Sequence, residues 1–318
     1  MLTESIKRKL DHYSNHRRYY LNACGDKLGP NIFGKRLKSE LKKLGWIYDP
    51  KVFDYNLAFI TGTYYPNKVN ILRLDGLYFD TEHTLGDNTQ LNAPLKKAYA
   101  EFDKIIFQSE FSRKMFFEHF GYADKPHRII YNGVPETFSP AGAKYKYPFG
   151  KTLICSAKWR AHKRLAAIIE GFKRLKMADV GLVVLGETPP VGPHKNIIFL
   201  NEIPQHKLPF YLRGADAFVH LCWLDCCPNS VIEALACGLP VLCNHNGGTK
   251  ELVKDSGIIM EFEETYNFRP VTLYKPPMPD PRLVARGMAA LLEWNKPVIR
   301  PDLYIDRVAK QYVEFFLE

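Results

Sequence analysis

The sequence has 318 residues, of which 46% are hydrophobic, 13% aromatic and 25% charged. This composition is typical of a folded protein and excludes a disordered chain, and the length favours two domains with a core each. No apolar run approaches the roughly 18–20 residues that cross a bilayer, and the first 18 residues are polar and basic. We therefore expect a cytoplasmic protein without a signal peptide or membrane span.

The formal net charge of +10 is concentrated in two blocks. Residues 1–50 carry 11 basic and 5 acidic side chains, and residues 146–200 carry 10 and 3. Each block is either a solvated face or a surface for an anionic partner, such as phosphate, nucleic acid or a membrane. The first block could rest on anionic lipid if the substrate is lipid-linked, so a membrane surface remains a candidate location.

Seven cysteines give no disulfide pattern, because their number is odd and five of them fall between residues 222 and 243. No C-x-x-C pair or zinc-type spacing is present. We expect reduced, buried thiols and no metal site.

Apolar runs that alternate with helical patterns predict a parallel α/β fold in the first half of the chain. The expected strands are Tyr19–Ala23, Asn56–Thr61, Asn70–Leu74, Lys104–Gln108 and Arg128–Tyr131, and the expected helices are Asn31–Leu44 and Ser112–Phe120. The segment 139–150 (SPAGAKYKYPFG) then interrupts the pattern and is interpreted as an interdomain linker.

The second half repeats the same alternation. The expected strands are Thr152–Ala157, Val180–Leu185, Asn196–Leu200, Ala217–Leu221, Pro240–Asn244 and Gly257–Met260, and the expected helices are Ala166–Leu175, Leu208–Leu212, Pro228–Ala236 and Leu283–Glu293. Two doubly wound parallel sheets side by side predict a cleft between two Rossmann-like domains, 1–145 and 146–300, in which a ligand binds.

A first motif runs from Gly29 to Arg36 and reads G-x-x-x-x-G-K. A nucleotide-triphosphatase loop needs Ser or Thr next, to hold Mg²⁺, and Arg36 stands there instead. We favour a weaker role, in which a turn that includes Gly29 and Asn31 offers backbone N–H groups to a phosphate or an acceptor sugar.

A second motif carries two lysines, Lys158 and Lys163, between an expected buried strand and the helix that follows. Both ammonium groups could reach one phosphate near the N-terminus of that helix. The alternative is a solvated basic turn. The position after the first strand of a domain favours phosphate binding.

A third motif runs from Asp225 to Pro240 and places one carboxylate, Glu233, on an otherwise small and apolar helix. A buried carboxylate is costly unless it is hydrogen-bonded, so Glu233 is either in a structural ion pair or binds a diol such as a ribose. The glycine-containing turn Asn246–Thr249 follows the next strand and suits close approach of a ligand.

These motifs together resemble the GT-B-fold glycosyltransferases, in particular the retaining family 4 (group 1) type. The matching pieces are the acidic-x(7)-Glu pair Asp225 and Glu233, the E-A-x-A-x-G-x-P-V run at 233–241, the G-G-x-x-E-x-V run at 247–253, the R-x(4)-K pair as Lys158 and Lys163, and the N-G-V…F…P segment at 132–140. Asp225 replaces the usual Glu, and Lys158 replaces the usual Arg.

The resemblance implies a role for each matching residue. Glu233 would bind the nucleotide ribose, and Lys158 and Lys163 would hold the diphosphate. Asp225 and the loop to Ser230, with Asn229, would contact the donor sugar, and Gly247 and Gly248 would line the site. The base would lie near 202–204, and a helix at about 301–318 would join the first domain.

Asp75 follows an expected strand in the first domain, where the family often has a histidine. It could orient an acceptor hydroxyl or act as a base, or it could simply be the Asp of an Asp-Gly turn. A base opposite the leaving group would invert the anomeric centre, whereas the resemblance implies retention.

We therefore expect a metal-independent glycosyltransferase with no prosthetic group. It would use a UDP- or GDP-linked sugar as donor and a hydroxyl acceptor such as a glycan, a lipid-linked sugar or a small molecule. A nucleotide-sugar epimerase or phosphorylase on the same fold is one alternative. A polyanion-binding module is another, although no nucleic-acid-binding motif is present and no nucleic-acid partner is expected. The sequence does not indicate the oligomeric state.

Overall fold

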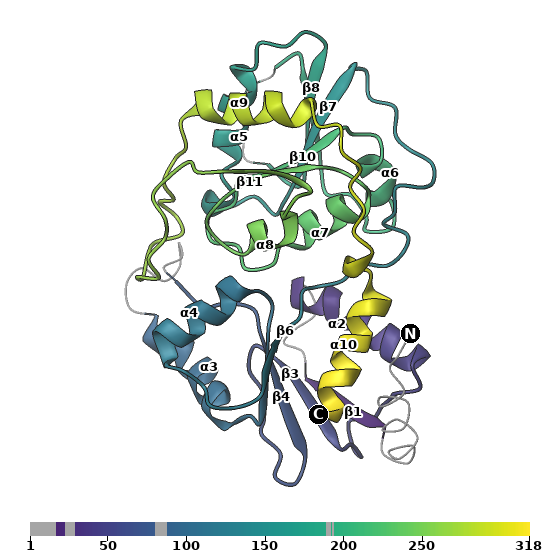
Figure 1. Ribbon diagram of the computed structural model, residues 1–318, viewed down its shortest axis with the longest axis vertical. Helices are drawn as coiled ribbons and strands as arrows, with labels where there is room; N and C mark the ends of the chain where they lie inside the picture. Colours follow the sequence, from purple (N-terminus) through teal and green to yellow (C-terminus); the bar gives the residue numbers. More distant parts are fainter. Residues whose placement is uncertain (1–16, 23–28, 80–87, 189–191, 193) are drawn as a thin grey trace. The chain divides into compact units, whose positions relative to one another are not determined.

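The structure is a computed structural model that describes residues 17–22, 29–79, 88–188, 192 and 194–318. The chain divides into two compact units (Figure 1). Unit 1 takes in the described residues of 1–78, 88–135 and 302–318, and unit 2 takes in those of 79–87 and 136–301. The division falls before the segment that we expected to be the linker.

Residues 136–150 belong to unit 2 because they pack on it. The backbone N–H of Tyr145 donates a hydrogen bond to the Phe210 carbonyl, and its ring stacks on Tyr211. The Arg213 side chain donates to the carbonyls of Thr137 and Ala143. The expected boundary at 145/146 therefore lies inside unit 2.

Unit 1 is built on a six-stranded parallel sheet with the strand order β2-β1-β3-β4-β5-β6. Its elements are β1 (Arg18–Asn22), α2 (Gly29–Lys43), β2 (Ile47–Tyr48), β3 (Tyr55–Phe59), β4 (Val69–Leu74), α3 (Thr89–Glu101), β5 (Lys104–Phe107), α4 (Glu110–Phe120), β6 (His127–Ile129), η2 (Pro301–Leu303, which spans the unit boundary) and α10 (Ile305–Leu317).

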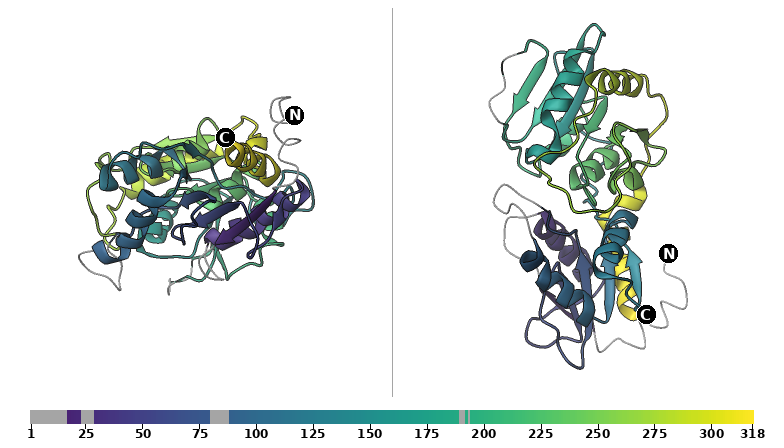
Figure 2. Two further views of the ribbon diagram at one scale, coloured as in Figure 1. Left: turned by 90° about the horizontal axis from the view of Figure 1, so that it is seen from below. Right: turned by 90° about the vertical axis from the view of Figure 1, so that its left-hand side faces the viewer.

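Both faces of this sheet are covered, since successive strand residues point to opposite faces. Leu57, Ile71 and Ile106 pack with α2 and α10 in one core. Ala58 and Leu72, one residue further along their strands, pack with α3 and α4 in a second core (Figures 1 and 2). This alternation explains why the strands read as continuous apolar runs.

Unit 2 repeats the architecture with the strand order β12-β11-β10-β7-β8-β9, again all parallel. Its elements are β7 (Lys151–Ser156), η1 (Ala161–Lys163), α5 (Leu165–Lys173), β8 (Val180–Leu185), β9 (Ile197–Leu200), α6 (Leu208–Leu212), β10 (Ala217–His220), α7 (Asn229–Ala236), β11 (Val241–Asn244), α8 (Thr249–Val253), β12 (Gly257–Met260) and α9 (Pro281–Leu292).

Helices α5 and α9 cover one face of the second sheet, and α7 and α8 contact β11 on the other (Figure 1). Gly171 allows α5 to approach α9 closely, because a Cβ atom there would lie 2.3 Å from Val284 Cγ1. The predicted doubly wound α/β class is confirmed for both units. Among the described residues, no helix combines the length and the apolar character needed to cross a bilayer.

Candidate functional site

The two predicted phosphate-binding lysines lie in the connection from β7 to α5. Lys158 is exposed, and its ammonium group has no hydrogen-bond or ion-pair partner among the described residues. Lys163 ends the single turn η1, and Arg164 then adopts a left-handed conformation (φ 57°) before α5 begins at Leu165. Both lysines therefore precede α5, on the connection that follows the carboxyl end of β7.

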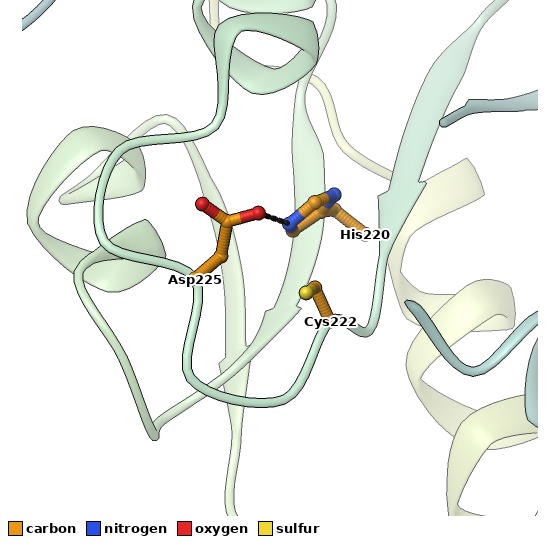
Figure 3. A group of neighbouring side chains, drawn as sticks. All are labelled: His220, Cys222 and Asp225. Atoms are coloured by element: carbon orange, nitrogen blue, oxygen red, sulfur yellow. Dashed lines mark ion pairs between the residues drawn. The ribbon is translucent and has the colours of Figure 1, made fainter. Parts of the chain in front are cut away.

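Lys163 is paired with Asp225, which lies in the loop between β10 and α7. The Lys163 ammonium donates a hydrogen bond to Asp225 Oδ2 and also contacts the Cys222 thiol. His220, the last residue of β10, places Nε2 3.9 Å from the same Asp225 oxygen (Figure 3). The pair lies at the carboxyl edge of the sheet, where ligands of open α/β sheets bind.

Electrostatics favour the charged forms of this pair. Burial by itself would raise the pKa of Asp225, but the Lys163 ammonium outweighs it and lowers this pKa to about 2. Burial by itself would lower the pKa of Lys163, but the Asp225 carboxylate outweighs it and raises this pKa above its usual value. The pair is therefore ionised at neutral pH.

The neighbouring groups are neutral at the same pH. Burial, with the nearby Lys163 charge, lowers the pKa of His220 and the pKa of His162 to about 4 each. Burial raises the pKa of the Cys222 thiol to about 12. Lys163 and Asp225 are thus the charged members of this group.

His220, Cys222 and Asp225 also have the donor atoms of a metal site, since one ligand atom from each lies within 4.8 Å of the others (Figure 3). A divalent ion there would meet the Lys163 ammonium, which already binds Asp225 and contacts Cys222. The donor set therefore fits the ammonium of Lys163 better than a metal ion.

Helix α7 carries Glu233 in its second turn, as the sequence predicts. The side chain is buried, with the residue only 5% exposed. Glu233 Oε1 accepts a hydrogen bond of 2.7 Å from Gln205 Nε2, and Gln205 lies in the turn between β9 and α6. Asn229 and Ser230 form the first turn of the same helix and are half-buried.

The loop after β11 is attached to the loop that contains Asp225. The Gly248 N–H donates to the Asp225 carbonyl at 2.8 Å, and the Asn244 amide donates to the Cys222 carbonyl at 2.9 Å. Gly247 has φ 86°, and a Cβ atom there would lie 2.9 Å from the Asp225 carbonyl oxygen. Only glycine fits this contact. The predicted turn is present, but its last residue, Thr249, already begins α8.

Several buried polar atoms around these loops have no hydrogen-bond partner within the described part of the chain. They lie at or after the carboxyl ends of β7, β10 and β11, and they are His162 Nδ1, His220 Nε2, Trp223 Nε1, His245 Nδ1 and Thr249 Oγ1. Buried polar atoms are normally satisfied. In unit 2 these atoms are available for hydrogen bonds to a polar ligand or to water at this edge of the sheet.

Behind this edge lies a buried ion pair that the sequence did not indicate. The Arg164 guanidinium lies 3.3 Å from Glu263 Oε2 and 5.1 Å from the centre of the Trp223 ring, and its side chain is fully buried. Glu263 in turn accepts a hydrogen bond from Asn246. Arg164 thereby connects three loops of the site, and nothing in its local sequence distinguishes it from a surface arginine.

Unit 1 holds the remaining predicted residues. Asp75 follows β4 directly and is ion-paired with Arg73, whose buried guanidinium also binds Asn132 and lies 4.6 Å from the centre of the Phe33 ring. The backbone carbonyl of Asp75 accepts a hydrogen bond of 3.4 Å from the Ser112 hydroxyl.

Helix α2 begins at Gly29, two residues earlier than expected, so Gly29 and Asn31 lie in its first turn and Gly34 lies within it. Their role as a phosphate or acceptor turn stays a prediction. A Cβ atom on Gly34 would lie 3.3 Å from the Phe59 ring, so this glycine serves helix–sheet packing. Asn31 is buried, and its Nδ2 has no partner among the described residues.

Comparison with known proteins identifies the segment that carries this site. Residues 146–265 match the model of the family described as glycosyl transferases, group 1. This segment is therefore similar to the group 1 glycosyltransferase domain. It includes Lys158, Lys163, Asp225, Gln205 and Glu233.

Relatives of this chain are remote in sequence. A GDP-mannose-dependent α-(1-6)-phosphatidylinositol monomannoside mannosyltransferase of Mycolicibacterium smegmatis is 24% identical over 187 residues, which cover 51% of this chain and 49% of that protein. The match thus spans about half the length of this curated relative.

Solved structures of similar fold cover nearly the whole chain. Sucrose-phosphate synthase of Thermosynechococcus elongatus aligns with a TM-score of 0.63 at 13% identity, over 95% of this chain and 94% of that one. An Anabaena protein in complex with UDP and glucose aligns with a TM-score of 0.62 at 13% identity, over 94% and 98% of the two chains. These likenesses and the two parallel sheets confirm the predicted GT-B fold.

Proposed function

We propose that this chain is a glycosyltransferase that moves a sugar from a nucleotide-diphosphate sugar to a hydroxyl acceptor. The observation that carries the proposal is the Lys163–Asp225 pair at the carboxyl edge of the second sheet, inside the group 1 segment. Glycosyl transfer releases a nucleotide diphosphate, and a fixed cation stabilises the charge that develops on this leaving group. Asp225 holds the Lys163 ammonium in place through their hydrogen bond.

The donor would bind to unit 2. Lys163 and the exposed Lys158 would bind the diphosphate, and Glu233 would bind the ribose diol. Asn229 and Ser230, with Gly247 and Gly248, would contact the donor sugar through backbone and side-chain groups. The unpartnered polar atoms of His220, His245 and Thr249 support a polar ligand at this edge.

We propose that the transfer needs no metal ion. Metal-dependent glycosyl transfer uses a divalent cation to neutralise the diphosphate, and Lys158 and Lys163 would supply this positive charge instead. The support is chemical, because the group that could ligate a metal in this region already surrounds the Lys163 ammonium.

Retention at the anomeric carbon is part of the proposal. The donor phosphate would then accept the proton of the attacking hydroxyl, so no protein base would be needed opposite the leaving group. Asp75 would orient the acceptor, since its carboxylate is already paired with Arg73. An NMR spectrum of the first-formed product distinguishes the two outcomes: an anomer opposite to that of the donor would overturn retention.

We propose a UDP- or GDP-linked hexose as donor. The support is that one relative is named as GDP-mannose-dependent and a structural neighbour was solved with UDP and glucose. Thermal unfolding with UDP, GDP and their hexose conjugates tests this, because a ligand at 100 times its Kd stabilises the folded state by about 2.7 kcal/mol. Stabilisation by none of them would contradict the proposal, and hydrolysis or epimerisation without an acceptor would identify a different enzyme.

The acceptor would bind to unit 1, which could also contact a membrane. Lys38 covers the exposed Tyr48 ring at 3.3 Å, and Ile47 and Val52 beside it are more than half exposed. Basic and apolar side chains together suit the surface of an anionic bilayer. Flotation with vesicles of phosphatidylglycerol and phosphatidylcholine tests this contact, and binding that does not weaken with salt or with Lys38→Glu would contradict it. The basic residues 7–9 lie outside the described residues.

A further inference from the structure

Gln205 contacts the carboxylate that would bind the ribose. Its Nε2 donates a hydrogen bond of 2.7 Å to Glu233 Oε1. Gln205 comes from the turn after β9, whereas Glu233 comes from α7, so the bond joins two segments that are 28 residues apart. Gln205 belongs to none of the sequence motifs that resemble the family.

The turn that carries Gln205 is itself ordered by the backbone. The Lys207 N–H donates to the Pro204 carbonyl at 2.8 Å, and α6 begins at the next residue. Gln205 is exposed, whereas the residue that it binds is only 5% exposed. An exposed amide therefore reaches inward to a buried carboxylate.

This contact matters because a diol needs a carboxylate in one orientation. A glutamate side chain has three rotatable bonds, and binding a ribose with both oxygens requires all three to be fixed. The Gln205 hydrogen bond holds Oε1 and so restrains the orientation of the Glu233 carboxylate before the nucleotide arrives.

We propose that Gln205 is a positioning residue that sets the recognition of the ribose 2′-hydroxyl by Glu233. The inference rests on the proposed function. In this proposal the turn at 204–207 controls ribose recognition, because its Gln205 orients the Glu233 carboxylate.

The experiment measures the affinity of the whole chain for UDP, GDP, 2′-deoxy-UDP and 2′-deoxy-GDP by titration calorimetry. The variants are Gln205→Ala, the isosteric Gln205→Glu, which removes both N–H donors, and the control His206→Ala. His206 is the next residue of the same turn and is also exposed. Thermal unfolding without nucleotide checks that each variant is folded.

We expect the wild-type affinity for a ribonucleotide to be at least about ten times its affinity for the 2′-deoxy form, because the deoxy form lacks one hydrogen bond to a charged group. Gln205→Ala should lower the affinity for the ribonucleotide about tenfold and that for the 2′-deoxy form less than about twofold. The ratio of the two affinities should then fall close to one. Gln205→Glu should do the same or more, because it places a carboxylate against Glu233. His206→Ala should keep the wild-type ratio.

An unchanged ratio in Gln205→Ala would overturn the inference, and so would an equal collapse in His206→Ala, which would indicate a general effect of the turn. Wild type that binds UDP or GDP without discrimination at the 2′ position would also overturn it, while nucleotide binding by the proposed function would stand. Wild type that binds neither nucleotide would overturn both.

Discussion

Lys163 donates a hydrogen bond to Asp225, a residue 62 positions later in the chain. The contact joins the loop after β7 to the loop after β10 and leaves both side chains largely buried, at 22% and 15% exposed. An ammonium held in this way is pre-oriented at the carboxyl edge of the sheet. Several measurable consequences depend on this pair.

Replacement of Lys163 by alanine should abolish transfer and also destabilise unit 2. Asp225 would lose its hydrogen bond to a charged group, which costs roughly 1–3 kcal/mol. Lys158→Ala is the matched control, because this lysine is exposed and unpaired within the described ranges: we expect weaker UDP or GDP binding but the same melting temperature. Calorimetry and thermal unfolding separate the two effects, and full transfer by Lys163→Ala would refute the assignment.

The pair should also make the stability depend on acidic pH. The pKa of Asp225 is about 2 in the folded state, against 3.8 for an unperturbed aspartate. The Asp225 contribution to stability is therefore present above pH 3.8 and is lost as pH falls towards 2, with a size of about 2 kcal/mol. Urea unfolding of wild type and Asp225→Asn from pH 6 to pH 2 measures it. The difference between the two proteins should shrink across this range, and a constant difference would contradict the pairing.

His220 predicts a second pH effect, centred nearer to neutrality. Burial lowers its pKa to about 4 in the folded state, against 6.5 when unperturbed, and the groups that face it are Asp225, Lys163 and His162. Its contribution is therefore present above pH 6.5 and is lost as pH falls from 6.5 to 4, up to roughly 3 kcal/mol. His220→Gln cannot titrate, so the stability advantage of wild type over this variant should fall across that interval. If wild type and His220→Gln differ in unfolding free energy by the same amount at pH 7 and at pH 4.5, this explanation is excluded.

Gly247→Ala should weaken nucleotide binding, whereas Gly121→Ala should not. Both glycines have positive φ, 86° and 89°, but a Cβ atom on Gly247 would collide with the Asp225 backbone, whereas one on Gly121 meets nothing within 4 Å. Alanine strains the backbone at both positions, by roughly 1–3 kcal/mol, and most at Gly121, whose φ of 89° and ψ of 165° suit only glycine. Only Gly247→Ala displaces the loop that contains Asp225. A UDP or GDP titration that gave equal losses for both variants would show that the loop contact has no influence on the site.

Substitutions of Arg164 and Glu263, which form a buried ion pair, should have strongly non-additive effects on the unfolding free energy. Arg164→Leu leaves the Glu263 carboxylate buried without its guanidinium, and we expect a loss of about 3–5 kcal/mol in unfolding free energy. The double variant Arg164→Leu/Glu263→Leu should recover part of this loss. Lys173→Ala, which removes an exposed helical pair with Glu170, should cost less than about 0.5 kcal/mol. Additive effects in the double variant would contradict a direct interaction.

Apolar runs were enough to predict most of the fold. Val180–Leu185 and Gly257–Met260 have the bounds that the sequence indicated, because each is a short apolar run at a regular spacing. Strand β2 was not predicted, since two residues at a sheet edge leave no pattern. Helix α3 was not predicted because Pro94 interrupts it, and α8 was taken for part of a turn.

The candidate site was predictable only where it consists of a local motif. Lys163, Asp225 and Glu233 stand at spacings that a sequence can show, but the contact of Lys163 with Asp225 depends on how two loops meet. Gln205 and Glu263 gave no signal, because their partners lie 28 and 99 residues away and become neighbours only after the parallel strands have aligned their carboxyl ends.

Helix α10 gives unit 1 a particular order of assembly during synthesis. Ile305, Val308 and Tyr312 of this helix belong to the same core as Leu57 and to no core of unit 2. The backbone of Val134 is bound to that of Ile305 on the far side of the intervening 170 residues. A ribosome therefore releases all of unit 2 before the helix that seals unit 1 emerges. Until α10 emerges, this face of the amino-terminal sheet is covered by α2 alone, so the apolar residues that α10 will contact stay exposed during synthesis of unit 2.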